Sequence, residues 1–88
     1  MAVTNRTGLT KLTAANDALG RSARVFLIRI SSGATGGAVV ITDGSETIWA
    51  PTIGTNAELF LAFYGARLAD VKATTLPATC NVFVFSED

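Results

Sequence analysis

The sequence has no histidine and a single cysteine, Cys80, among its 88 residues. The absence of histidine excludes His-based catalytic machinery, and a lone cysteine excludes a disulfide within the chain and a cysteine-rich zinc site. Cys80 lies in an apolar, Thr-flanked run and is expected to be a small buried hydrophobe, the alternative being a reactive or intermolecular thiol. These counts predict a protein that is not an enzyme and that needs no cofactor or metal.

Long apolar runs are also missing. The longest apolar stretches, at residues 25–28 and 59–64, have the length of a strand and are far shorter than the roughly 20 residues of a membrane-spanning helix. The first twelve residues contain no apolar run of the length that a signal peptide needs. We therefore expect no targeting segment and no membrane partner.

Charge is scarce and unevenly distributed. Charged residues make up 16% of the chain and apolar residues 49%, whereas a charged share of about 25% is usual. Residues 1–30 hold five basic residues and one acidic residue, and residues 31–88 hold two basic and six acidic residues, so their net charges are +4 and −4. This asymmetry indicates either a basic arm that reaches an acidic partner or an ordinary solvated surface. The basic residues are spread out, so direct binding of nucleic acid is not expected.

The hydrophobic pattern from residue 21 onward is that of strands separated by turns. In residues 23–31, Val25, Leu27 and Arg29 alternate with Phe26, Ile28 and Ile30, and both sets are largely apolar, as in a strand that is covered on both sides. Further strands are expected at residues 38–42, 46–50, 57–63, 68–74 and 79–85.

Turn signals separate these strands. Asp43-Gly44 predicts a type I′ hairpin, and Gly65 is expected to end the strand that precedes it. Residues 1–20 are rich in Thr, Asn and Ala and are expected to form an extended N-terminal arm, with a short strand near residues 9–14. The sequence thus predicts an all-β fold, a small antiparallel β-sandwich or jelly-roll-like barrel of six to seven strands over residues 21–88.

Two patterns that carry chemistry in other proteins have simpler explanations here. The run Gly33–Gly37 is glycine-rich like a phosphate-binding loop, but the residues after it, 38–41, form a strand and include no Lys-Ser/Thr pair, so a hairpin loop is expected. Asp43, Glu46 and Glu58 are explained by a turn and by solvent-facing strand positions, not by an acid–base pair or a calcium site.

Apolar residues on both faces of several strands predict an interface, because a chain of 88 residues cannot bury two full faces of a sheet by itself. We therefore expect a homo-oligomer in preference to a monomer. The candidate interface residues are Arg6, Lys11, Arg21, Leu27, Trp49, Phe60 and Phe85.

The order of these segments resembles the small β-sandwich structural proteins of tailed bacteriophages, a family that includes head decoration (cement) proteins. The resemblance spans about residues 20–86 and rests on strand pattern and turn residues, in the segments ARVFLIRI (23–30), AVVITDG (38–44), IWA (48–50), AELFL (57–61), GARLADV (65–71) and CNVFVF (80–85).

The resemblance implies a virion protein on the capsid surface that binds the major capsid protein, assembles as a trimer or ring, and clasps a neighbour with its N-terminal arm. Two alternatives stay open at this point. One is a tail, baseplate or head–tail adaptor component of the virion. The other is a carbohydrate-binding sandwich that uses Trp49 and Tyr64.

Overall fold

The structure, a computed structural model, describes residues 7–87, and within them it contains strands and loops but no helix. This confirms the all-β expectation. The strands are β1 (Thr7–Leu12), β2 (Asp17–Ala18), β3 (Ala23–Ser31), β4 (Gly37–Ala38), β5 (Val40–Asp43), β6 (Glu46–Trp49), β7 (Thr52–Ile53), β8 (Glu58–Leu68), β9 (Val71–Thr75) and β10 (Asn81–Glu87).

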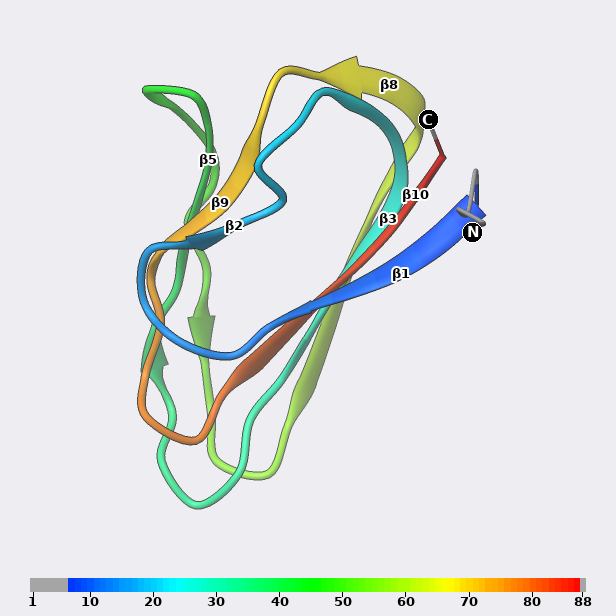
Figure 1. Cartoon of the computed structure of the whole chain (residues 1–88). Helices are drawn as coiled ribbons and strands as arrows, with labels where there is room; N and C mark the ends of the chain where they lie inside the picture. Colours follow the sequence, from blue (N-terminus) through cyan, green and yellow to red (C-terminus); the bar gives the residue numbers. More distant parts are fainter. Residues whose placement is uncertain (1–6, 88) are drawn as a thin grey trace.

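The strands form two packed sheets (Figure 1). Sheet A has the order β1-β10-β3-β8, sheet B has the order β2-β9-β5-β6, and β4 and β7 form a separate short pair. The antiparallel pairs are nested: β1 with β10, β2 with β9, β3 with β8, β4 with β7 and β5 with β6. These nested pairs together form one long antiparallel hairpin. Two further pairings, β10 with β3 and β5 with β9, join neighbouring pairs of this hairpin into the two four-stranded sheets. The result is the strand order of a jelly roll.

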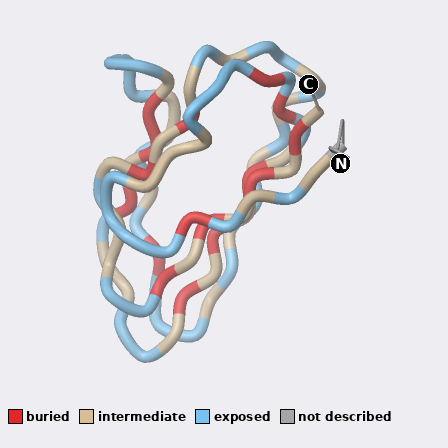
Figure 2. The backbone as a smooth tube through the Cα atoms, viewed as in Figure 1, coloured by how far each residue is buried: buried red, intermediate tan, exposed pale blue. Residues whose placement is uncertain are grey.

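The core lies between the two sheets and consists mainly of aliphatic side chains. Val25, Ile28 and Ile30 of β3 are completely buried, as are Val82 and Val84 of the neighbouring β10. Figure 2 shows the consequence along these strands, where buried residues alternate with more exposed ones. Sheet A therefore has an inner face that closes the core and an outer face that points away from sheet B.

A β-bulge in β3 changes which residues belong to each face. The expected strict alternation put Val25 with Leu27 and Phe26 with Ile28. Leu27 pairs with Phe85 of β10 but Val25 pairs with Ser86, so β3 has one residue more than β10 at this point. Phe26 is 40% exposed, whereas Val25 and Ile28 are fully buried. The extra residue at the bulge lets Val25 and Ile28, which are three positions apart, both point into the core, which the strict two-residue alternation of a regular strand does not allow.

The structure places residues 7–20 in the body of the fold and not in a separate extended arm. The strand expected near residues 9–14 is β1, and it pairs with β10 along its whole length. Leu12 is 2% exposed and belongs to the core. The turn to β2 is held by Asp17, whose carboxylate accepts hydrogen bonds from the backbone N–H groups of Thr13 (3.0 Å) and Ala14 (3.1 Å). Residues 1–6 lie outside the described part of the chain.

Gly65 does not end its strand, because β8 continues through it to Leu68. Tyr64 and Gly65 both have positive φ angles, 54° and 83°, and form an irregular step opposite the bulge of β3. The ring of Phe26 lies over Gly65, where a Cβ atom would come within 2.9 Å of Cε1. A glycine at this position therefore allows the two strands to stay paired on either side of the step.

The hairpin expected at Asp43-Gly44 is present between β5 and β6, but its turn differs from the prediction. Asp43 pairs with Glu46, so the two loop residues are Gly44 and Ser45. Gly44 has φ 63° and Ser45 is not among the residues with positive φ, which is the pattern of a type II′ turn and not of a type I′ turn. The Asp43 carboxylate instead accepts hydrogen bonds from the backbone N–H groups of Ala69 (2.8 Å) and Asp70 (3.0 Å).

The glycine-rich segment after β3 is a loop but not the expected hairpin, because β3 pairs with β10 and β8 whereas β4 pairs with β7. The loop packs against β7 and the chain that follows it. The Ser32 hydroxyl accepts a hydrogen bond from the N–H of Ala57 (2.9 Å) and donates to the carbonyl of Gly54. Gly36 lies so close to this chain that a Cβ atom would come within 2.4 Å of the carbonyl oxygen of Ile53. Gly54, by contrast, has open space where a Cβ atom would stand.

This difference predicts unequal effects of two alanine substitutions. Gly36→Ala forces backbone apart at a tight contact and is expected to lower the free energy of unfolding by about 2 kcal/mol or more. Gly54→Ala meets no atom and is expected to change it by less than about 0.5 kcal/mol. Urea denaturation of the two variants and the unsubstituted chain gives the measurement. Equal losses for both variants would contradict the close packing at Gly36.

Candidate functional site

The outer face of sheet A is crossed by two rows of side chains, which we take as the candidate site. The cross-strand register defines the rows, because directly paired residues point to the same side of a sheet. The first row contains Lys11, Phe83, Arg29 and Phe60. The second row contains Leu9, Phe85, Leu27 and Ala62. The alternate residues on the same strands form the inner rows that pack into the core.

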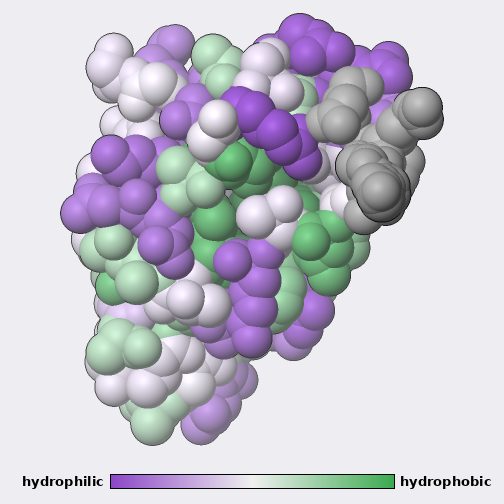
Figure 3. All heavy atoms as spheres, viewed as in Figure 1, coloured by the Kyte–Doolittle hydropathy of each residue, from purple (hydrophilic) through white to green (hydrophobic). Residues whose placement is uncertain are grey.

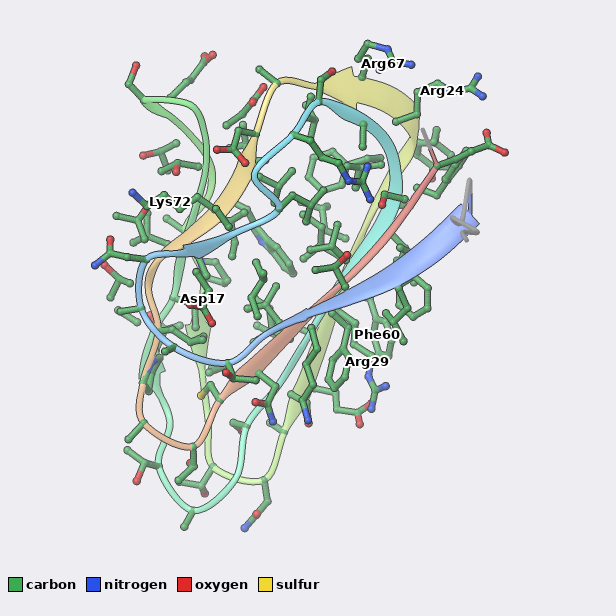
Figure 4. The ribbon with its side chains drawn as sticks, viewed as in Figure 1. Asp17, Arg24, Arg29, Phe60, Arg67 and Lys72 are labelled. Carbon is green, nitrogen blue, oxygen red and sulfur yellow. The ribbon has the colours of Figure 1, made fainter. Side chains whose placement is uncertain are left out.

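These rows are accessible although most of their residues are apolar. Phe60 is 57% exposed and Leu9 is 56% exposed, while Leu27, Phe83 and Phe85 are half-buried by their neighbours on the sheet. Figure 4 shows Arg29 and Phe60 projecting from the side of sheet A that faces away from sheet B. Within the described residues, no other element covers this outer face.

Cations flank an aromatic ring in the first row. Lys11 Nζ lies 5.7 Å from the centroid of the Phe83 ring, and the Arg29 guanidinium carbon lies 5.0 Å from it. Both distances are in the range of cation–π interactions. Arg29 Nη2 also donates a hydrogen bond of 2.6 Å to Glu58 Oε2, which lies on the same outer face in the next row, with Ser31 and Asn81. The two rows themselves contain two cations and no carboxylate.

Charge is separated between sheet A and the rest of the fold. The strands of sheet A carry four basic and two acidic residues, whereas residues 13–22, 32–57 and 69–80 carry two basic and four acidic residues. The excess of basic residues in sheet A is clearest at Arg24 and Arg67, two like charges that are cross-strand partners (Figure 4). Arg24 is balanced by Glu87, at 2.5 Å, and Arg67 Nη1 donates to the Ser22 hydroxyl. The outer face therefore suits a partner that is apolar and acidic.

Four of the seven candidate interface residues meet on the outer face of sheet A. Lys11, Leu27, Phe60 and Phe85 come from four different strands and lie in the two adjacent rows. Leu9, Arg29 and Phe83, which complete these rows, were not among the predicted interface residues. The available signal was that Arg29 and Phe83 each lie two residues from a chosen residue, Leu27 or Phe85, and so share its face.

The other three candidates do not join this site. Trp49 is half-buried on β6 and packs against the core. Arg21 is exposed in the loop between β2 and β3. Arg6 lies outside the described residues. Tyr64, the other residue of the carbohydrate alternative, is 90% exposed at the irregular step of β8.

The carboxylates considered for catalysis or metal binding are separated and have other partners. Asp43 is bound by two backbone N–H groups, and Glu58 is paired with Arg29. Glu46 is exposed at the start of β6. Between residues 7 and 87, no group of three or more His, Cys, Asp or Glu side chains is placed to hold a metal ion.

Apolar atoms are also visible between the two sheets, in a hollow at the middle of the view in Figure 3, with hydrophilic residues around it. In this view the two sheets are seen from the side on which β1 and β2 lie. β1 and β2 belong to different sheets and do not pair. The hollow is therefore the open side of the sandwich.

Cys80 is buried in the core, as expected, with 1% of its surface exposed. Its Sγ atom lies 3.5 Å from the carbonyl oxygen of Thr35. Burial disfavours the charged thiolate and raises the pKa of the Cys80 thiol above its ordinary value. The thiol is thus kept protonated and inaccessible, which does not suit a nucleophile.

Comparison with known proteins adds no relative: no family model and no curated protein matches the chain. Within residues 7–87, no helix has the length and apolar character needed to cross a membrane.

The burial of Cys80 predicts slow thiol chemistry in the folded protein. We expect an aromatic disulfide reagent to modify Cys80 at least about 100-fold more slowly in native protein than in denaturant, because the reactive thiolate forms only when the core opens. Absorbance of the released thiolate at pH 8 gives both rates.

The same shift predicts a loss of stability at alkaline pH. A thiol with a raised pKa in the folded state contributes its stability fully below the unfolded pKa and loses it as the pH rises above that value. Unfolding of the unsubstituted chain should therefore become easier above about pH 9 relative to Cys80→Ala, which has no thiol to ionise. A parallel pH dependence for the two proteins would contradict this prediction.

Proposed function

We propose that this protein is a non-enzymatic virion structural protein, a decoration protein that binds the surface of a capsid through the outer face of sheet A. The observation that carries the proposal is this face itself, whose two rows of apolar and cationic side chains include the exposed residues Leu9 and Phe60 and are not covered by any other described element. The order of strand and turn segments, which resembles small phage structural proteins, supports the same function. Viral capsid domains are also among the proteins that use the jelly-roll fold, which is an argument from analogy of fold.

The chemistry of the outer face favours adhesion over catalysis. It combines the aromatic rings of Phe60 and Phe83 with the cations Lys11 and Arg29 and contains no hydroxyl, thiol or carboxylate in its two rows. Aromatic residues and arginine are the side chains that contribute most to protein interfaces. An apolar surface with carboxylates at its rim is the complementary partner, and the acidic residues there would meet Lys11 and Arg29.

The size of the outer face indicates how it would work. Eight side-chain positions on a sheet occupy on the order of 300 Å², given strands about 4.8 Å apart and a rise of about 3.3 Å per residue. Stable protein complexes bury about 800 Å² on each partner. A single copy would therefore bind weakly, and several linked copies on a repeating lattice would bind tightly through avidity. This favours a partner that displays many identical sites, as a capsid does.

The N-terminal segment has a different role in this proposal from the one that the sequence predicts. Because residues 7–20 belong to the body of the fold, they are committed to contacts within the chain. We therefore assign the contact with the shell to the outer face and not to a long clasping arm. A place at the tail or baseplate would use the same face, and the number of copies per particle separates the two positions: hundreds for a decoration protein and a few for a tail component.

Substitutions on the outer face should weaken binding to particles that were assembled without this protein. Phe60→Ser removes an exposed ring, and Lys11→Glu reverses a charge, so each is expected to reduce affinity by about tenfold or more. Co-sedimentation with the particles measures binding, and the unsubstituted protein is expected to raise the thermal stability of the shell.

Matched controls test whether the effect belongs to this face. Lys72→Glu makes the same charge change on sheet B, and Tyr64→Ser removes an exposed aromatic residue outside the two rows. Both are expected to bind as the unsubstituted protein does. Failure of the unsubstituted protein to bind or stabilise the particles would refute the proposed function.

A further inference from the structure

The four edges of the two sheets differ in how they are protected from pairing with another chain. β2 has only two residues, β6 has four and is soon followed by Pro51, and β1 carries Lys11. Short edges, proline and lysine are the usual means by which proteins block pairing at an edge. β8, the fourth edge, has eleven residues and contains no proline and no charged residue between Glu58 and Arg67.

β8 is also the least covered strand of sheet A. Its inward-facing residues Leu59, Leu61 and Phe63 are only half-buried, although the inward residues of β3 and β10 are fully buried. None of the eleven residues of β8 is fully buried. The core therefore remains partly open along this edge, and nothing in residues 7–87 pairs with it.

The hydrogen bonds at the start of β8 show which backbone groups face this open side. Ser32 N–H donates to the carbonyl of Ala57 (2.9 Å), one step before the first registered pair, Ser31 with Glu58. Hydrogen-bonded and non-hydrogen-bonded pairs alternate along an antiparallel ladder. The N–H and C=O groups of Glu58, Phe60 and Ala62 therefore point away from β3, toward the free edge.

We propose that β8 pairs with β8 of a second copy, in antiparallel orientation about a two-fold axis, so that two copies of sheet A form one eight-stranded sheet. The free backbone groups of one copy would bond those of the other, and the neutral runs of the two strands would lie side by side. Added strands would also cover the exposed sides of Leu59, Leu61 and Phe63. The inference concerns the free protein and does not depend on the proposed shell partner.

A second copy of β8 fits this edge better than β1 of a second copy does. Pairing with β1 would bring Lys11 onto the neutral run and would produce a head-to-tail ring or filament, whereas pairing of β8 with itself closes as a dimer. The regular part of β8 ends at the step of Tyr64 and Gly65, so about 20 Å of strand is available. A contact of this size predicts a dimer that dissociates on dilution.

The outer faces of the two copies would become continuous in this dimer. Phe60 and Ala62, the β8 members of the two rows, would lie next to the same residues of the partner. The area that can bind a further surface would double, which supplies the linkage between copies that avidity requires.

Sedimentation equilibrium over a wide range of concentration tests the inference. The unsubstituted protein is expected to approach twice the 9.1 kDa mass of the chain at high concentration. Ala62→Pro removes a donor on the free edge without removing a hydrogen bond to β3 and is expected to weaken the dimer at least tenfold. Ala62→Thr keeps the donor and favours a strand, so it is the matched control and is expected to dimerise normally.

A second variant keeps the test decisive if Ala62→Pro perturbs the fold. Ala62→Lys retains the backbone donor and places a charge close to the two-fold axis, so it is expected to dissociate the dimer, most strongly at low salt. Three results would overturn the inference: a monomer at every concentration, a dimer that both variants leave unchanged, or a trimer.

Measuring particle binding by the unsubstituted protein separates the two proposals, because Ala62 itself belongs to the second row of the outer face. A monomeric protein that still binds particles would leave the proposed function standing. A dimer that binds no particles would leave only the inference about β8.

Discussion

The pairing of β10 with β3 is the contact on which the rest of the structure depends. The nested pairs alone would form a long two-stranded ribbon, in which each strand pairs with only one other strand. When β10 also pairs with β3, the ribbon folds over on itself, and the pairs β1–β10 and β3–β8 enter one sheet while β2–β9 and β5–β6 enter the other. The same pairing aligns Phe83 with Arg29 and Phe85 with Leu27 and thereby assembles the outer face. Core and candidate site thus have one common origin.

Local patterns were sufficient to predict much of the fold. The alternation in residues 23–31 and 79–85 identified the two central strands β3 and β10, and Asp43-Gly44 marked a hairpin. Which strands become neighbours is not encoded locally, so the partnership of β1 with β10 could not be derived, and residues 7–20 were expected outside the sandwich. The bulge at Phe26 and the step at Gly65 were also not predicted. The two features lie opposite each other on β3 and β8, and the Phe26 ring packs over Gly65, so neither can be recognised before the pairing of the two strands is known.

The candidate site shows a similar division. Exposed apolar residues were expected from the shortage of charge, and four of the interface candidates, Lys11, Leu27, Phe60 and Phe85, lie on the outer face of sheet A. Their assembly into two rows required the register, which only the sheet provides. Trp49 is the opposite case. It was taken as an interface candidate because it is large and rare, but on β6 its side chain packs against the core. Composition identified the kind of surface, and topology decided where that surface lies.

The nesting of the strands has a consequence for synthesis of the chain. Thr7 in β1 is paired with Glu87 in β10, so the first strand of the sandwich must wait for its last strand to be made. β3 likewise lacks its β10 neighbour until β10 has been made. Contacts between such distant residues make folding slow. The growing chain therefore exposes its most apolar strands until β10 has left the ribosome, and the sandwich closes as one unit only after that point.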